Sequence, residues 1–197
     1  GPWTLFAYAV EGSHSGTLAP SKTLLHLFPK FCERLVPLLI RNIELQLRSG
    51  AELVMIFDTA AGELSPHVFA AEVIPQLELL AQRFPSRLGY YSKGTQRDHL
   101  DHSVFTDGDF AGIGVDYRWD LREALDLFTR GFVQGNFDPA LLLCEHGELK
   151  KRLRDYLKPL TNHTRDGWVC GLGHGVLPGT PEENVRLFVS TVREVLS

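Results

Sequence analysis

Five short apolar runs rich in β-branched or aromatic residues recur along this chain, and each comes before a stretch with helical periodicity. A short strand followed by an amphipathic helix is typical of a βα unit. Strands joined through helices run parallel and share one sheet. The predicted strands are residues 53–57, 88–92, 112–116, 132–134 and 168–172, and the predicted helices are residues 23–48, 66–83, 121–130, 148–157 and 181–196.

Proline follows a potential capping residue at three predicted helix starts. An N-cap oxygen accepts a hydrogen bond from a free backbone amide, and proline is tolerated next because its missing N–H has no helical partner there. At the last start we expect Thr180 as N-cap and Glu183 as the second half of a capping box. The three pairs are Ser65-Pro66, Asp138-Pro139 and Thr180-Pro181.

Composition limits the class of protein. With 44% hydrophobic and 22% charged residues, the 197-residue chain predicts one globular domain, residues 1–197, with a substantial core. A net charge of −4 without a basic run argues against nucleic acid as a partner. No apolar run approaches the ~20 residues of a membrane span, and no signal-peptide pattern is found. We expect a cytoplasmic protein in which Cys32, Cys144 and Cys170 are reduced core thiols.

Polar residues stand where the predicted strands end. In a parallel sheet all the carboxyl ends meet at one edge, and this edge is where α/β proteins bind ligands. Because side chains alternate along a strand, only one of two neighbours at its end should face the centre. The residues expected at this edge are Asp58, Thr59, Lys93, Asp116, Asn136, Asp138 and His174.

His174 is the strongest candidate for chemistry. It follows a predicted strand within Gly171-Leu172-Gly173-His174-Gly175, where glycines allow a tight turn and the close approach of a ligand. An imidazole gives up or takes up a proton near neutral pH, so it serves as an acid, a base or a partner for carboxylates. We favour this role over a structural hydrogen bond to a neighbouring loop.

The other residues at this edge have structural interpretations as well. Turn formation explains Asp58 and Thr59 as well as ligand binding does. Capping accounts for Asp138, and we favour a structural role for Asn136. Lys93 and Arg118 are candidate partners of Asp116, although a lone lysine is usually just solvated.

Six blocks, in order through nearly the whole chain, resemble the uroporphyrinogen decarboxylase family. The two most specific are Gln-Gly-Asn-x-Asp-Pro and Leu-Gly-His-Gly. The blocks are Pro2-Trp3-Thr4-Leu5 through Tyr8 to Gly12, Phe57-Asp58-Thr59 with Gly62, Lys93-Gly94, Gly114-Val115-Asp116, Gln134-Gly135-Asn136-Phe137-Asp138-Pro139, and Leu172-Gly173-His174-Gly175 through Pro181-Glu182.

The resemblance implies a (βα)8 TIM barrel, of which this chain is a partial barrel of about five βα units, strands four to eight. It implies a cofactor-independent decarboxylase of haem biosynthesis that binds no metal and converts uroporphyrinogen to coproporphyrinogen. By this resemblance Tyr8, Phe57, Thr59 and His174 bind the substrate. Tyr8 and His174 are the catalytic candidates, and Phe57 forms part of an apolar wall.

Some features of the family have no counterpart in these residues. They are an arginine-rich loop that binds substrate carboxylates and an aspartate that gathers the pyrrole NH groups. We therefore expect that the chain alone neither binds porphyrinogen tightly nor turns it over. We also expect that it forms a homodimer or associates with an N-terminal segment or another chain.

Two other functions stay open on the sequence. One is a non-catalytic half-barrel that serves as an interaction or folding module. The other is the related corrinoid-dependent methyltransferase branch, which uses a zinc-bound thiolate. The lack of a His-x-Cys pair and the wide separation of the cysteines weigh against the second.

Overall fold

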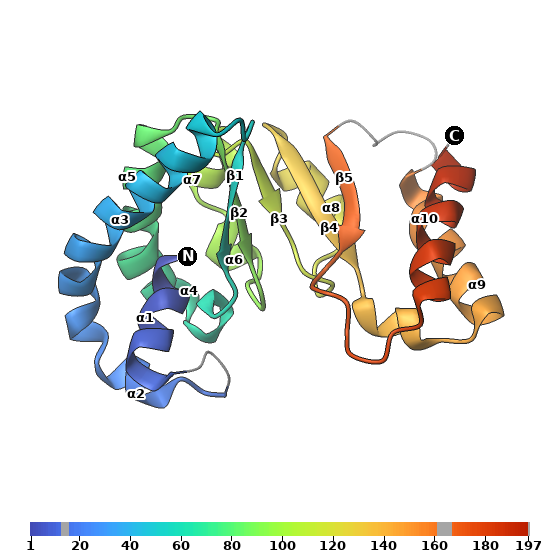
Figure 1. Ribbon diagram of the computed structural model, residues 1–197, viewed down its shortest axis with the longest axis horizontal. Coiled ribbons are helices and arrows are strands. Elements are labelled where there is room, and N and C mark those ends of the chain that lie inside the picture. The colour runs from blue at the N-terminus through green and yellow to red at the C-terminus, as the bar shows by residue number, and fades with distance from the viewer. Residues whose placement is uncertain (13–15, 161–166, 197) are drawn as a thin grey trace.

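A computed structural model describes residues 1–12, 16–160 and 167–196. Their strands form one parallel sheet in the order β1-β2-β3-β4-β5, so each strand pairs with its neighbour in sequence (Figure 1). This confirms the predicted parallel α/β fold. The strands are β1 (Val54–Asp58), β2 (Leu88–Ser92), β3 (Gly112–Gly114), β4 (Phe132–Phe137) and β5 (Trp168–Leu172).

Helices lie along one side of this sheet and at both of its ends. Helices α1 and α3 stand at the β1 end, and α9 and α10 stand at the β5 end (Figure 1). The helices are α1 (Pro2–Glu11), α2 (Ala19–Thr23), α3 (Phe28–Arg48), α4 (Pro66–Val68), α5 (Ile74–Arg83), α6 (Arg97–Leu100), α7 (Ser103–Thr106), α8 (Leu121–Leu127), α9 (His146–Leu157) and α10 (Glu182–Leu196). None of the helices in the described ranges has the length and apolar character needed to cross a membrane.

The five predicted helices are present, with some shifted ends. A 3-10 turn, Leu25–Leu27, precedes α3, so that helix begins five residues later than predicted. The predicted helix 66–83 contains a π-helical turn, Phe69–Val73, between α4 and α5. Pro75 follows this turn, and it has no N–H to donate to the carbonyl four residues earlier.

Helix α1 was not among the predicted helices. Pro2 lies in its first turn, and its C-cap is Gly12, whose φ is 69°. The amide of Gly12 donates to the Tyr8 carbonyl at 2.9 Å. Proline near the start and glycine just past the end are the two signals that could have identified this helix.

Two of the three predicted caps are confirmed. The Ser65 side chain accepts from the Val68 amide, and the Asp138 carboxylate accepts from the Ala140 amide, where it begins a 3-10 turn. The prediction for Thr180 is wrong. Its hydroxyl donates to the Leu177 carbonyl at 2.8 Å, and helix α10 begins at Glu182, after Pro181.

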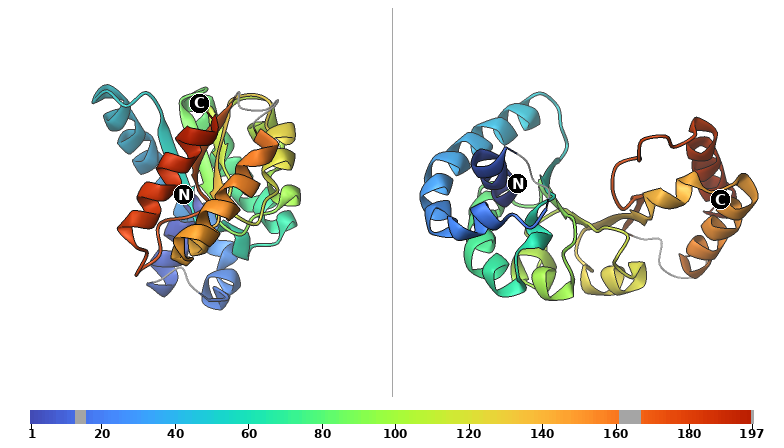
Figure 2. Two further views of the ribbon diagram at one scale, coloured as in Figure 1. Left: turned by 90° about the vertical axis from the view of Figure 1, so that its right-hand side faces the viewer. Right: turned by 90° about the horizontal axis from the view of Figure 1, so that it is seen from below.

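The two faces of the sheet differ in character. Along β1, Val54, Ile56 and Asp58 are buried, whereas Phe57, on the opposite face, is 60% exposed. The right-hand view of Figure 2 shows α8 on one side of the sheet and the loop between β5 and α10 on the other. We call the face that carries Phe57 the open face.

Glycines on the middle strands make room for large side chains from their neighbours on the open face. A Cβ at Gly112 would come within 2.4 Å of the Phe132 ring, and one at Gly114 within 2.9 Å of the Tyr91 ring. The parallel register aligns Phe57 with Tyr91 and Tyr91 with Gly114. Aromatic side chains from the flanking strands therefore cover the glycines of β3.

Candidate functional site

A cavity of about 400 Å³ lies on the open face at the carboxyl ends of the strands. It brings together Phe57 from β1, Thr59 from just after β1 and His174 from just after β5, three of the predicted site residues. We call it the open-face cavity. Its lining residues are Met55, Phe57, Thr59, Tyr91, Gly114, Gln134, Leu172, His174, Gly175 and Val176.

Tyr91 links the three predicted residues of this cavity, and sequence reasoning missed it. Its hydroxyl donates to the Gly173 carbonyl at 2.7 Å, one residue before His174. Its ring meets the Phe57 and His174 rings edge-on, with centroid separations of 5.8 and 6.4 Å. Burial is the largest of the effects that raise the pKa of Tyr91, so this hydroxyl stays protonated and can donate.

Tyr8, the fourth predicted residue, is not among the residues that line the open-face cavity. It lies on α1 and is 43% exposed. Thr4, one helical turn earlier, is hydrogen-bonded to Asp58 at the end of β1. Residues four apart share one face of a helix, so Tyr8 lies on the side of α1 that meets the end of β1.

Asp58 holds α1 against the sheet. Its carboxylate is fully buried and accepts from the Thr4 amide and the Thr4 hydroxyl, both at 2.7 Å. The Thr4 hydroxyl in turn accepts from the Ala60 amide at 2.9 Å. Of the two neighbours at the end of β1, Thr59 reaches the cavity and Asp58 has a structural role.

Asp116 likewise has a structural role at the end of β3. Its buried carboxylate accepts from the Gly94 amide at 2.6 Å and from the Arg118 guanidinium at 2.5 Å. Of the two candidate partners, Arg118 is therefore the one that pairs with it. The Arg118 guanidinium also lies over the Tyr117 ring, 4.7 Å from its centroid.

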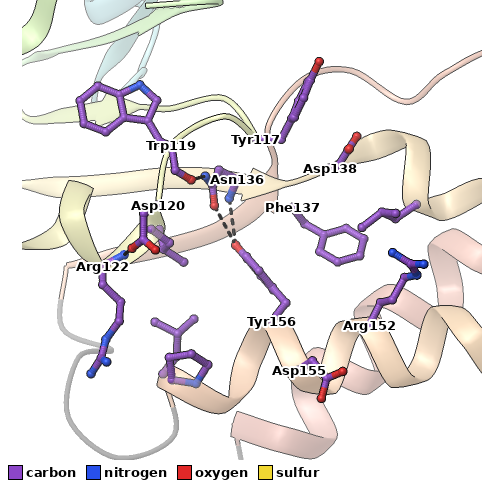
Figure 3. A pocket seen from close by; sticks show the side chains of 14 residues that line it. Tyr117, Trp119, Asp120, Arg122, Asn136, Phe137, Asp138, Arg152, Asp155 and Tyr156 are labelled. Atoms are coloured by element: carbon purple, nitrogen blue, oxygen red, sulfur yellow. Dashed lines mark hydrogen bonds between the residues drawn. The ribbon is translucent and has the colours of Figure 1, made fainter. Parts of the chain in front are cut away.

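A larger cavity, of about 550 Å³, lies between α8 and α9 (Figure 3). We call it the α8–α9 cavity. Of the predicted residues, only Asn136 and Asp138, for which structural roles were favoured, are among those that line it. Its lining residues are Tyr117, Trp119, Asp120, Leu121, Arg122, Asn136, Phe137, Asp138, Leu141, Arg152, Asp155, Tyr156, Pro159 and Leu160.

Polar groups that line the α8–α9 cavity are already hydrogen-bonded within the protein. The Asn136 amide group donates to the Asp116 and Trp119 carbonyls at 2.9 and 2.8 Å, and the Tyr156 hydroxyl accepts from the Asn136 backbone amide (Figure 3). Arg152 pairs with Glu148 at 2.7 Å. The structural role favoured for Asn136 is confirmed, because its side chain binds backbone carbonyls of the loop that follows β3.

All three cysteines are free thiols. Cys32 is buried, and Cys144 and Cys170 are half-buried. Burial raises the pKa of Cys170 to about 11 and is the largest cause that raises that of Cys32 to about 12. Within the three described ranges, no group of three or more histidine, cysteine, aspartate or glutamate side chains is placed to hold a metal ion.

A family model described as uroporphyrinogen decarboxylase (URO-D) matches residues 1–195. The chain belongs to the uroporphyrinogen decarboxylase family. A uroporphyrinogen decarboxylase from Thermus thermophilus is 34% identical over 201 residues, which cover 98% of this chain and 58% of that protein. The one from Schizosaccharomyces pombe is 30% identical over 205 residues, with 95% and 56% covered. The chain thus spans under three fifths of the length of these curated relatives.

Comparison with solved structures supports the fold. A methyltransferase from Methanosarcina mazei superposes with a TM-score of 0.62 over 77% of this chain and 44% of that one. The two sequences are 23% identical, so the likeness concerns the fold alone. Five parallel strands in sequential order, with helices between them, agree with the TIM-barrel type of fold implied for the uroporphyrinogen decarboxylase family.

Proposed function

We propose that this protein decarboxylates the acetate side chains of uroporphyrinogen, and that the open-face cavity is part of its substrate cleft. The observation that carries this proposal is the meeting of Phe57, Thr59 and His174 at one cavity. These residues come from blocks more than 100 positions apart that separately match the family's pattern. Tyr8 joins them in this proposal, from the face of α1 that meets the end of β1.

The chemistry suits such a cavity. Protonation of a pyrrole turns the ring into an electron sink, so the bond from the acetate methylene to its carboxylate breaks and carbon dioxide leaves. The electron pair enters the ring, a proton then adds to the methylene carbon to give a methyl group, and the ring releases the proton that it first took up, so that one proton is consumed for each carbon dioxide released. A hydroxyl and an imidazole at the cavity wall orient the reacting carboxylate and provide hydrogen bonds as charge moves. Phe57 provides an apolar surface for the macrocycle.

We propose further that the cleft is completed by groups beyond these residues. The family's arginine-rich loop and its pyrrole-binding aspartate would supply charge that the open-face cavity does not carry among its lining residues. In this proposal the chain works together with an N-terminal segment, as a homodimer or within a larger assembly.

The test is the anaerobic turnover of uroporphyrinogen, followed by chromatography of the oxidised porphyrins. The chain is assayed alone and with the N-terminal remainder of the Thermus relative. We expect coproporphyrinogen only from the mixture. We expect His174→Asn to reduce the rate by about 100-fold or more, because it removes the proton-carrying group. The matched control is His67→Asn, which changes a histidine on α4 outside the cavity and should leave the rate unchanged.

Two results would contradict the proposal. One is that neither the chain nor the mixture consumes porphyrinogen. The other is equal turnover by the wild-type protein and His174→Asn. Turnover by the chain alone would contradict only the claim that further groups are needed.

A further inference from the structure

Tyr91 crosses the open face to reach the turn that carries His174. It lies on β2, whereas its hydrogen-bond acceptor, the Gly173 carbonyl, lies beyond the end of β5, with β3 and β4 between the two strands. The side chain is 9% exposed. The bond of 2.7 Å has the usual length for a hydroxyl donor and is buried, so it ties the turn directly to the Tyr91 hydroxyl.

The Tyr91 ring has little room to move. It lies over Gly114, where an added Cβ would come within 2.9 Å of a ring carbon. Its edge contacts with Phe57 and His174 hold the ring from two other directions. A ring fixed by its neighbours loses little further freedom when its hydroxyl forms a hydrogen bond, so the bond transmits the ring's position to the turn.

The turn itself is fixed on its far side as well. A Cβ at Gly173 would come within 2.4 Å of the Tyr117 backbone nitrogen and 3.1 Å of the Asn136 carbonyl oxygen. The Gly173 amide donates to the Phe137 carbonyl at 2.8 Å. Gly173 is therefore held between the ends of β3 and β4 and the Tyr91 hydroxyl.

We propose that Tyr91 is a positioning residue that sets the place of His174 in the open-face cavity through its hydrogen bond to Gly173. The effect of this positioning on catalysis rests on the proposed function. Its effect on the position of His174 does not. Tyr91 acts through the backbone of a neighbouring residue. It is thus distinct from Phe57, Thr59 and His174, which the resemblance assigns to substrate contact.

The preceding residue provides a matched control. Tyr90 lies on the same strand and points to the opposite face, where it is fully buried, and its hydroxyl donates to Asp58 at 3.4 Å. Tyr90→Phe and Tyr91→Phe remove the same atom from adjacent residues. Only the second removes a bond to the turn before His174.

The first experiment measures the ring C–H resonance of His174 by NMR, assigned through its disappearance in His174→Asn. We expect Tyr91→Phe to shift this resonance by more than its linewidth and Tyr90→Phe to leave it in place. Gly114→Ala should shift it in the same way as Tyr91→Phe, because the new methyl group displaces an intact tyrosine. If His174 does not move in either Tyr91→Phe or Gly114→Ala, the proposal is wrong.

The second experiment measures kcat and KM in the assembly that consumes uroporphyrinogen. Tyr91→Phe keeps the ring, so we expect KM to change less than twofold and kcat to fall about fivefold to tenfold, the effect of one lost neutral hydrogen bond on a catalytic group. Tyr90→Phe should retain kcat. Equal losses of kcat in the two variants would overturn the proposal. If no assembly consumes porphyrinogen, the proposed function fails, and the His174 resonance still decides the role of Tyr91.

Discussion

At the scale of single residues, the Thr4 hydroxyl links helix α1 to the end of β1 through two buried hydrogen bonds. It donates to the buried Asp58 carboxylate and accepts from the Ala60 amide, so it satisfies two buried groups at once. We expect Thr4→Val, which keeps the shape, to lower the free energy of unfolding by about 2 to 3 kcal/mol, because both partners lose a hydrogen bond while they remain buried. Urea denaturation measures this difference.

Thr23→Val is the control for that substitution. The exposed Thr23 hydroxyl donates to the Pro20 carbonyl, which water can reach. Its loss should change stability by no more than about 0.5 kcal/mol. Equal effects of the two substitutions would show that the Thr4 hydroxyl does not hold α1 to the sheet.

The sequence predicts the position of a side chain correctly where one local rule, such as alternation along a strand, decides which face it lies on. Alternation along a strand predicts that only one of Asp58 and Thr59 faces the centre, and Thr59 lines the cavity. The same rule places Tyr90 and Tyr91 on opposite faces without saying which face is open. That choice depends on the register with β1 and β3, which is set by packing between strands distant in sequence.

At the scale of elements, strand β4 contains a glycine, Gly135, at a position that has no room for a side chain. Gly135 has a φ of +129°, and an added Cβ would come within 2.5 Å of the Val115 carbonyl oxygen. We expect Gly135→Ala to destabilise the protein by about 3 kcal/mol or more, because backbone strain and a steric clash add together. Thermal or urea unfolding measures the loss.

Gly147, in the first turn of α9, is the matched control. An added Cβ would meet nothing within 4 Å. Alanine is the better helix former, so Gly147→Ala should stabilise the protein by roughly 0.5 to 1 kcal/mol. A tolerated Gly135→Ala would contradict the close approach of the β3 and β4 backbones.

Element types were more predictable than element ends. All five predicted strands and all five predicted helices are present, because the hydrophobic pattern identifies each one. Strand β3 ends at Gly114, two residues earlier than predicted, and β4 extends to Phe137, three residues later. Strand ends depend on pairing with the neighbouring strands, and this information is not local.

At the scale of the whole molecule, buried acids predict how stability responds to alkaline pH. Burial raises the pKa of Cys170 from 9.0 to about 11 and is the largest cause that raises those of Tyr90, Tyr91 and Tyr156. Between the unfolded and folded pKa values the unfolded chain loses protons that the native protein keeps. The free energy of unfolding should therefore fall as the pH rises above about 9.

Urea midpoints at pH 8, 9, 10 and 10.5 test this dependence. Cys170→Ala removes one of the contributing groups, so its midpoint should fall less steeply over the same range. A midpoint that stays constant up to pH 10.5 would show that these groups ionise as readily in the native protein as in the unfolded chain.

The parallel sheet and the edge that bears the polar residues follow from the order of strands and helices alone. The division of those residues between structural and cavity positions does not. Thr59 and His174 reach the open-face cavity, whereas Asp58, Asp116 and Asn136 are buried in hydrogen-bonded positions. Which side of the sheet each one faces depends on the packing of the whole molecule.

The proposed binding site of the tetrapyrrole is the open-face cavity. A methyl-resolved NMR titration with reduced uroporphyrinogen, carried out on the assembly that consumes it, tests this claim directly. We expect shifts for Thr59, Leu172 and Val176, which line the open-face cavity, and none for Leu141 and Leu160, which line the α8–α9 cavity. Shifts confined to Leu141 and Leu160 would place the tetrapyrrole in the α8–α9 cavity and contradict the proposed site.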